Sequence, residues 1–270
     1  MTTAVINYKE LVHLTPFAAK PDKLDRDYPL TNIYVAAKTG ELVVADGARM
    51  QSVKGAVSFD TTTYFDGFML DAQLVKKLHR AVKGAGLKPD TVQAHITDTF
   101  NINLSVSYHG HTLQLSGWLN TGQYPRYEQL FPTTEVHKLC FHTNTMLEAL
   151  AAVKPFANKR TSIVKLTYQP TAKTITLSVT DADGKRTRGT PISTPYNGWC
   201  VPMPPRHLHI PYLVECLKMY EALNVGFVLL TSNGGLSPVV ITPSYDPPNG
   251  REEAVIRRHL ICSVDAKESN

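Results

Sequence analysis

The order in which helices and strands are predicted repeats along this chain, and that repeat constrains the fold more than any single motif does. An amphipathic helix is predicted over residues 71–83, because apolar residues recur there at helical spacing. These residues are Leu70, Leu74, Leu78, Ala81 and Val82. A shorter helical segment from Tyr8 to about Ala18 precedes it, so the first half of the chain is expected to hold two helices.

The segments around these helices alternate apolar and polar residues at the period of a β-strand. A hairpin is expected from strands at residues 32–35 and 42–44. Gly40 stands in the turn between them, where a left-handed backbone is usually required. The other strands predicted in this half are 91–96, 102–106 and 112–115.

The same order begins again after Pro132. A helix is expected from about Asn144 to Pro155, with Met146, Leu147 and Leu150 inward. Another begins near Pro211, with a buried stripe of Leu213, Cys216, Leu217 and Tyr220. Strands are predicted at 163–166, 175–179, 225–230, 239–241 and around 260–262. The pattern therefore predicts an α+β chain of two domains, residues 1–133 and 134–270, each with two helices packed on antiparallel sheets.

The composition is that of an ordinary soluble globular protein. Of the 270 residues 43% are apolar and 19% are charged, and the net charge is +5. A charge this small permits nucleic acid or another acidic partner and selects neither. The four cysteines are far apart, which is typical of reduced thiols, and the sequence shows neither a signal pattern nor an apolar run long enough for a membrane span. We therefore expect a cytoplasmic protein.

The usual sequence marks of an enzyme are missing: there is no phosphate-binding glycine loop, nucleophile elbow or zinc-protease helix. Two histidine pairs, His109 with His111 and His207 with His209, have a spacing that can chelate a metal on one strand face. The sequence implies no third ligand for either pair. We expect no catalytic residue, no cofactor and no metal ion.

Two segments carry the most specific signal. The first is Ala45-Asp46-Gly47-Ala48-Arg49-Met50, and the second is Gly122-Gln123-Tyr124-Pro125-Arg126-Tyr127. Taken singly, the first is explained by a tight Asp-Gly turn and the second by a proline-stiffened linker between domains. Two further segments follow in order: a helix at Ile210–Leu217 and a strand at Ser237–Ile241.

These four segments, in this order, resemble the bacterial DNA sliding clamps, the β subunit of DNA polymerase III. In that family the middle domain has a Thr-Asp-Gly-His-Arg-Leu turn and ends in a Gly-x-Phe/Tyr-Pro-x-Tyr linker. The last domain has a helix of the type Asn-x-x-Tyr-Leu-x-x-x-Leu and a Ser-x-Pro-x-x-Ile strand. The resemblance covers nearly the whole chain and implies two clamp-like domains, similar to the family's middle and last domains, with nothing that corresponds to its first.

The resemblance also implies a groove that receives a short hydrophobic peptide from a DNA polymerase or clamp loader. Its residues in this sequence are Leu30, Asp46, Gly47, Arg49, Met50, Pro125, Gln129, Leu130 and Ile261. The chain departs from the family at three places. Ala48 replaces the usual histidine, Gln129 replaces a frequent arginine, and Leu260–Val264 replaces the C-terminal Met-Pro-x-Arg-Leu.

A row of basic residues lies on the predicted helix 71–83, on the face opposite the leucine stripe. Lys76, Arg80 and Lys83 are spaced i, i+4 and i+7, with Lys77 at the edge. A solvated helix face is the ordinary explanation. The resemblance implies instead that such helices line a ring and face the phosphates of duplex DNA, which need no base reading. Weaker candidates on or near the other predicted helices are Lys9, Lys20, Lys159, Arg160 and Arg206.

The favoured hypothesis is a DNA sliding clamp, a processivity factor that encircles duplex DNA and tethers polymerase through the groove. Clamp rings resemble six domains around a hole, so two domains per chain predict a head-to-tail homotrimer. A second hypothesis is a clamp-like interaction protein that does not encircle DNA and binds clamp-motif peptides or a full-length clamp. An enzyme of unrecognised type is the third.

Overall fold

The chain folds into two compact units in the computed structural model. The structure describes residues 2–20, 28–60, 66–120, 122–131, 137–180, 187–193, 201, 203–233, 237–244 and 256–263. The N-terminal unit comprises Met1–Arg126 with Glu252–Arg257, and the C-terminal unit comprises Tyr127–Arg251 with Arg258–Asn270. The predicted domain boundary between residues 133 and 134 falls outside the described residues.

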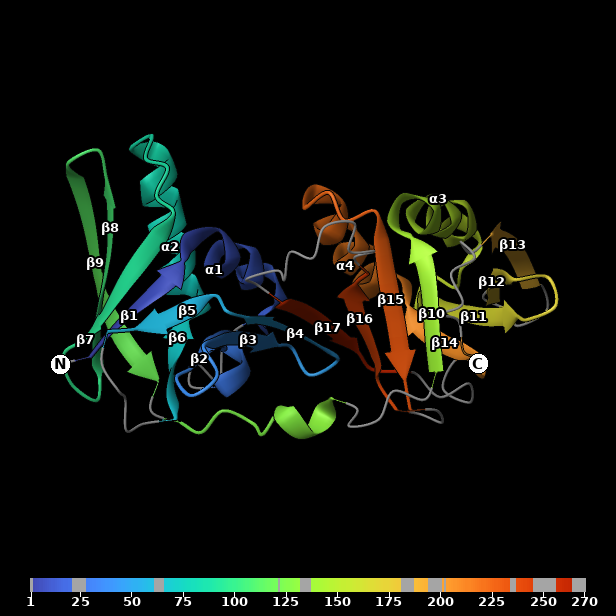
Figure 1. Ribbon diagram of the computed structural model, residues 1–270, viewed down its shortest axis with the longest axis horizontal. Coiled ribbons are helices and arrows are strands. Elements are labelled where there is room, and N and C mark those ends of the chain that lie inside the picture. Colours follow the sequence, from blue (N-terminus) through green and yellow to red (C-terminus); the bar gives the residue numbers. More distant parts are fainter. Residues whose placement is uncertain are drawn as a thin grey trace. The chain divides into compact units, whose positions relative to one another are not determined.

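The fold is α+β, as predicted, with two α-helices and antiparallel sheets in the described part of each unit (Figure 1). In the N-terminal unit the strands pair in the order β4-β3-β2-β6-β9-β8-β7-β1-β5. Their bounds, with those of the helices, are β1 Thr2–Asn7, α1 Tyr8–Leu14, β2 Asn32–Ala36, β3 Glu41–Ala45, β4 Arg49–Lys54, β5 Val57–Phe59, β6 Gly67–Asp71, α2 Ala72–Gly84, β7 Thr91–Ile96, β8 Asn101–Tyr108 and β9 His111–Asn120. Short 3-10 turns lie at Thr15–Phe17 and Pro29–Thr31.

Both helices of the N-terminal unit begin directly after a strand. Asn7 ends β1, and its side-chain oxygen accepts a hydrogen bond from the Glu10 amide at 3.1 Å; Asp71 ends β6 and accepts one from the Gln73 amide at 2.8 Å. These side chains satisfy amides that a helix start leaves without partners. Helix α2 ends before Gly86, whose φ of +68° favours glycine.

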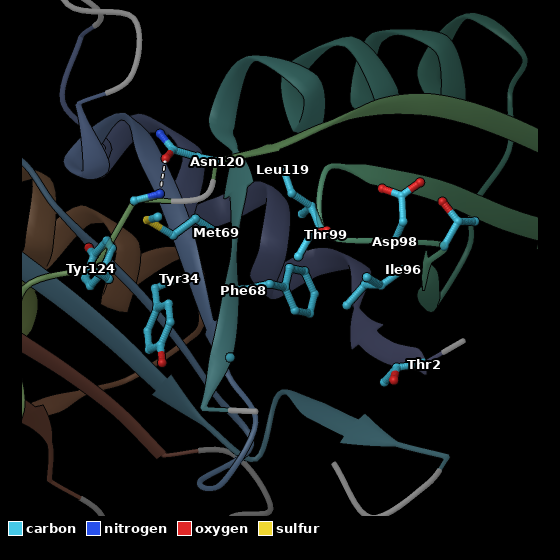
Figure 2. A pocket seen from close by; sticks show the side chains of 13 residues that line it. Thr2, Tyr34, Phe68, Met69, Ile96, Asp98, Thr99, Leu119, Asn120 and Tyr124 are labelled. Atoms are coloured by element: carbon cyan, nitrogen blue, oxygen red, sulfur yellow. Dashed lines mark hydrogen bonds between the residues drawn. The ribbon is translucent and has the colours of Figure 1, made fainter. Parts of the chain in front are cut away.

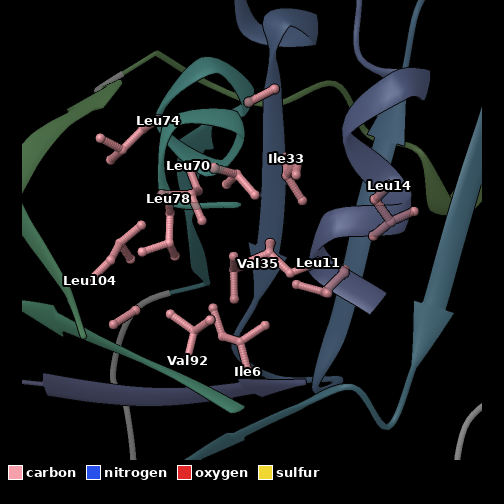
Figure 3. Packing of buried hydrophobic residues seen from close by; sticks show 14 of the residues in the cluster. Ile6, Leu11, Leu14, Ile33, Val35, Leu70, Leu74, Leu78, Val92 and Leu104 are labelled. Atoms are coloured by element: carbon pink, nitrogen blue, oxygen red, sulfur yellow. The ribbon is translucent and has the colours of Figure 1, made fainter. Parts of the chain in front are cut away.

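The core of this unit lies between α1, α2 and the sheet strands (Figure 3). Helix α2 buries Ala72, Leu74, Val75, Leu78 and Val82. Two residues predicted for the buried stripe of this helix, Leu70 and Ala81, do not belong to it. Leu70 is buried but belongs to strand β6, and Ala81 is exposed. The predicted hairpin between β2 and β3 is confirmed, and Gly40 in its turn has a φ of +61°.

The C-terminal unit has two antiparallel sheets, ordered β10-β15-β16-β17 and β13-β12-β11-β14. Its elements are β10 His137–His142, α3 Thr143–Val153, β11 Ile163–Gln169, β12 Thr174–Thr180, β13 Thr187–Ser193, β14 Arg206–His209, α4 Ile210–Ala222, β15 Phe227–Ser232, β16 Val239–Pro243 and β17 Ile256–Ile261. The first two residues of β17, Ile256 and Arg257, belong to the N-terminal unit. Short 3-10 turns lie at Glu128–Leu130 and Lys154–Phe156. The predicted stripe on α4 is buried in full, and the Tyr220 hydroxyl donates to the Ile241 carbonyl at 3.0 Å.

The repeating unit of helices and strands is smaller than the sequence pattern indicated. Each unit contains two copies of one motif, a strand and a helix followed by three strands. In the N-terminal unit the copies are β1-α1-β2-β3-β4 and β6-α2-β7-β8-β9, with the short β5 between them. In the C-terminal unit they are β10-α3-β11-β12-β13 and β14-α4-β15-β16-β17. The motif therefore occurs four times along the chain.

None of the helices in the described ranges has the length and apolar character needed to cross a bilayer. Of the cysteines in these ranges, Cys140 and Cys216 are buried free thiols, and Cys262 is an exposed one.

Candidate functional site

Helix α2 presents a continuous basic face. Lys77, Arg80 and Lys83 are exposed and Lys76 is partly exposed, while the opposite face packs into the core. No acidic residue lies within the helix. His79 on the same helix forms a hydrogen bond with Tyr8, whose hydroxyl lies 2.8 Å from His79 Nδ1. Four cations within about two helical turns can follow a row of phosphates without recognising bases.

The other predicted DNA-facing cations divide into exposed and buried groups. Lys9 is exposed on α1, and Lys20, Lys159 and Arg160 are exposed in segments outside the helices. Arg206 differs from all of these. It lies on β14, is 2% exposed, and its Nη2 donates to the Ser232 hydroxyl at 2.6 Å.

Burial lowers the pKa of the Arg206 guanidinium below its ordinary value. The expectation that Arg206 lies on the surface at a helix end was wrong. Strand β14 alternates, and Arg206 shares the inward face of that strand with Leu208. Its guanidinium bonds inside its own unit and does not reach the surface.

The predicted Asp-Gly turn is present, and its own side chains stabilise it. Asp46 Oδ1 accepts hydrogen bonds from the amides of Ala48 and Arg49, both at 3.1 Å, and Asp46 Oδ2 pairs with Arg49 Nε at 2.9 Å. Gly47 adopts a φ of +94°, which favours glycine. The Arg49 guanidinium also lies 4.9 Å from the centroid of the Phe17 ring. Asp46 and Arg49 are thus largely engaged within the turn and its surroundings.

The segment after β9 is anchored by buried tyrosines. Tyr124 is buried and stacks on Tyr34, with ring centroids 5.0 Å apart and an interplanar angle of 9°. Burial raises the pKa of the Tyr124 hydroxyl far above its ordinary value. Tyr127 is buried as well, while Pro125 between them is exposed. Tyr34 was not among the predicted site residues, because it looks like any other residue of an alternating strand.

The apolar residues predicted for the peptide groove are mostly core residues of their own units. Leu30 and Met50 are buried in the N-terminal unit, and Ile261 is buried in the C-terminal unit. Leu130 is 46% exposed and Gln129 is exposed, both on the 3-10 turn Glu128–Leu130. The groove as predicted takes residues from both units and stays a prediction. From Val264 onward the chain lies outside the described residues.

The sequence matches no family model and no curated protein. The structure, in contrast, is similar to several solved ones. A Caulobacter crescentus β sliding clamp is 16% identical, with a TM-score of 0.74 over 98% of this chain and 66% of that chain. A Pseudomonas aeruginosa sliding clamp, DNA polymerase III subunit β, is 13% identical, with a TM-score of 0.75 over 97% and 65%. A Bacillus subtilis DNA polymerase sliding clamp is 18% identical, with a TM-score of 0.72 over 98% and 64%.

The chain has the bacterial sliding-clamp fold. It spans about two thirds of the length of the clamps it matches. The likeness confirms the resemblance that the sequence motifs suggested. Helix α4 begins at Ile210, as predicted, and the strand predicted at Ser237–Ile241 is observed two residues later, as β16.

Within this clamp fold, the described residues contain no group of three or more histidine, cysteine or acidic side chains that could hold a metal. His207 and His209 lie on β14, and the His209 ring packs 4.5 Å from the Tyr212 ring. His109 occupies the turn between β8 and β9, with a φ of +48°. The candidate site of this clamp-like chain therefore consists of the basic face of α2 and the exposed residues around Leu130.

Proposed function

We propose that this protein is a non-enzymatic DNA sliding clamp that works inside the cell. A closed ring retains DNA without binding it tightly, because escape requires an interface to open. Weak, sequence-neutral contacts to phosphates then permit sliding. The observation that carries the proposal is the uninterrupted row of Lys76, Lys77, Arg80 and Lys83 on one helix of a chain with the clamp fold.

The charge row is tested by reversing Lys76, Arg80 and Lys83 to Glu together. Retention on nicked circular DNA is then expected to fall on the order of tenfold or more, and its dependence on salt to become shallower. The matched control reverses Lys54, Lys88 and Lys165, which are exposed and lie outside the helices, with the same change in net charge. Equal losses in both variants would mean that α2 has no special role.

The ring is proposed to be a homotrimer of two-unit chains arranged head to tail. Three copies of a 29.9 kDa chain give an assembly of about 90 kDa. Analytical ultracentrifugation at micromolar concentration measures this mass directly. A stable monomer of the same chain, with no larger species across the concentration range, would rule out the simple ring.

The proposed partners are a DNA polymerase and a clamp loader that dock through short hydrophobic peptides. Leu130 supports this proposal, since it is a large apolar side chain left 46% exposed beside the exposed Gln129. We expect Leu130→Ala to weaken binding of a fluorescent Leu-Phe-containing clamp-motif peptide without lowering the melting temperature. Phe156, exposed to a similar extent at 44%, gives the matched control as Phe156→Ala.

A second candidate function is a clamp-like interaction protein that does not encircle DNA. One observation favours it: the exposed ionisable residues of α3 and α4 are Glu148, Glu215, Lys218 and Glu221, so these helices are not basic. The test is topological. A ring stays on circular DNA and is lost once the DNA is cut, whereas a non-encircling protein behaves alike on both forms.

A further inference from the structure

Among the described residues, the N-terminal end of strand β6 has no partner strand on one of its two sides. It pairs with β2 over its whole length, from Asn32 opposite Asp71 to Ala36 opposite Gly67. On the other side, its described ladder with β9 covers only Met69 and Leu70, which lie opposite Asn120 and Leu119. At the end of β9, Asn120 Oδ1 accepts a hydrogen bond from the Gly122 amide at 2.8 Å.

A pocket of about 500 Å³ opens at this edge, within the size range of ligand-binding pockets (Figure 2). It is lined from both faces of β6. On one face lie Met69 and the stacked rings of Tyr34 and Tyr124, and on the other lie Phe68 and Leu119. All of these residues belong to the N-terminal unit.

Gly67 permits this arrangement. Its φ is +155°, and a Cβ at this position would lie 2.3 Å from the Val35 carbonyl oxygen and 2.9 Å from the Tyr34 ring. A larger residue would therefore displace Tyr34, which forms one wall of the pocket. The Tyr34 ring and the open backbone of β6 depend on the same glycine.

A pocket that wraps around an open strand edge suits an extended peptide. A strand placed beside Gly67 and Phe68 would direct successive side chains to opposite faces of the sheet. One of these would contact the tyrosine pair and the next would contact Phe68 and Leu119. The edge backbone supplies affinity and the two apolar faces supply selectivity, as in other cases of strand addition.

Among the described residues that line the pocket, Asp98 is the charged one, and it lies in the exposed loop between β7 and β8. Its carboxylate accepts hydrogen bonds from the amides of Phe100 and Asn101 at 2.8 and 2.9 Å. The Asn101 side chain and these amides hold the pKa of Asp98 below its ordinary value, so the carboxylate is ionised at neutral pH. The pocket is thus apolar with a negative charge at its mouth.

We propose that this pocket binds a short extended peptide that carries large apolar side chains and a basic residue, added as a strand beside Gly67 and Phe68. The Gly67 edge of the site lies away from the Asp46 turn, although the hydroxyl of Tyr124, which lines the pocket, lies beside the Ala45 backbone. That turn follows Ala45 at the end of β3 next to the start of β2, whereas Gly67 lies opposite Ala36, at the other end of β2. The proposal does not depend on ring formation or DNA binding.

The probe is a fluorescein-labelled pentapeptide, acetyl-Arg-Leu-Phe-Val-Arg-amide, titrated into the full chain and followed by fluorescence anisotropy. We expect saturable binding. Replacing both peptide arginines by glutamate should weaken it, because a repulsion replaces an attraction. N-methylation of the central amide should weaken it about two- to tenfold, the effect of one lost hydrogen bond.

Two protein variants locate the site. Asp98→Asn keeps an acceptor for the loop amides and is expected to weaken binding about two- to fivefold, as for one exposed ion pair. Thr99→Trp places a large ring in the pocket from an exposed loop position and is expected to abolish binding. Asp90→Asn, an exposed carboxylate outside the pocket, is the matched control and should bind as the parent does.

The absence of saturable binding up to millimolar peptide would overturn the proposal, and so would binding that Thr99→Trp leaves unchanged. Amide chemical shifts in the presence of peptide distinguish the two surfaces. Changes at Gly67 and Phe68 support the proposal, and changes confined to Gly47 and Ala48 contradict it.

Discussion

A buried ion pair, Glu10 with Arg257, offers the most exacting test of the packing in the N-terminal unit. Arg257 Nη2 lies 2.5 Å from Glu10 Oε1, and Arg257 Nε lies 3.1 Å from Glu10 Oε2. The two residues are 247 positions apart, yet both belong to the N-terminal unit. Their side chains are 5% and 10% exposed, so solvent screens the pair little.

Removing one partner of such a pair leaves the other charge buried and uncompensated. Glu10→Gln is therefore expected to lower the free energy of unfolding by about 3–5 kcal/mol, and Arg257→Met by a similar amount. The double variant Glu10→Leu with Arg257→Met replaces both charges by apolar groups of similar size. Its stability should be close to that of the parent, because desolvating the two charges costs about as much as their attraction returns.

Urea denaturation followed by circular dichroism measures these free energies, provided that the transition is analysed for more than one step in a chain of two units. Lys38 and Asp66 give a matched control. Their Nζ and Oδ1 atoms are also 2.5 Å apart, but the side chains are 77% and 78% exposed, and Lys38→Met should cause no measurable change. Two results would contradict a buried, tightly paired charge: a fall in the free energy of unfolding of less than about 1 kcal/mol for Glu10→Gln, or a double variant as unstable as the single variants.

Three further predictions concern the same unit. Gly84→Ala, at the last residue of α2, should raise the free energy of unfolding by up to about 1 kcal/mol, whereas Gly86→Ala, at a φ of +68°, should lower it by about 1 kcal/mol; paired urea titrations compare them. Burial lowers the pKa of His13, so the unfolded chain binds a proton more readily than the folded chain does. The free energy of unfolding therefore falls as the pH drops through the ordinary value of 6.5. His13→Gln should make the free energy of unfolding depend less on pH between 7.5 and 5.5. Asp46→Ala removes the acceptor of two turn amides and should cost about 1–2 kcal/mol, whereas an unchanged melting temperature would mean that the turn does not need it.

The sequence predicted the helices well and missed the strands that lead into them. Each helix follows a strand without an intervening loop, and the last strand residue is the helix N-cap: Asn7, Asp71, His142 and His209. The apolar period changes from two to 3.6 at one residue, with no intervening loop to mark the change. Leu70 was assigned to the helix for this reason. The four strand-helix motifs became visible only when these strands were placed.

The charged residues were predictable where a strong apolar stripe fixed the opposite face. On α2 the buried Leu74, Val75 and Leu78 leave only one face for the lysines, and these are exposed or, for Lys76, partly exposed. Arg206 had no such stripe. Its strand is four residues long, and only the alternation with Leu208 indicates that the side chain points inward. A charge on a short strand is therefore a weaker indication of a surface than a charge on an amphipathic helix.

Whether an apolar side chain of the predicted groove stabilises the core or can contact a partner depends on its exposure, which the sequence does not encode directly. Leu30 and Leu130 are the same residue type, and the resemblance assigned them the same role. Leu30 is buried within the N-terminal unit, so Leu30→Ala would create a cavity and lower stability whether or not a peptide binds there. Leu130 is 46% exposed, so its truncation leaves little cavity, and any loss of peptide binding reports on the surface itself. A loss of binding in a Leu30 variant is therefore evidence about the fold, and only a loss in a Leu130 variant is evidence about a partner site.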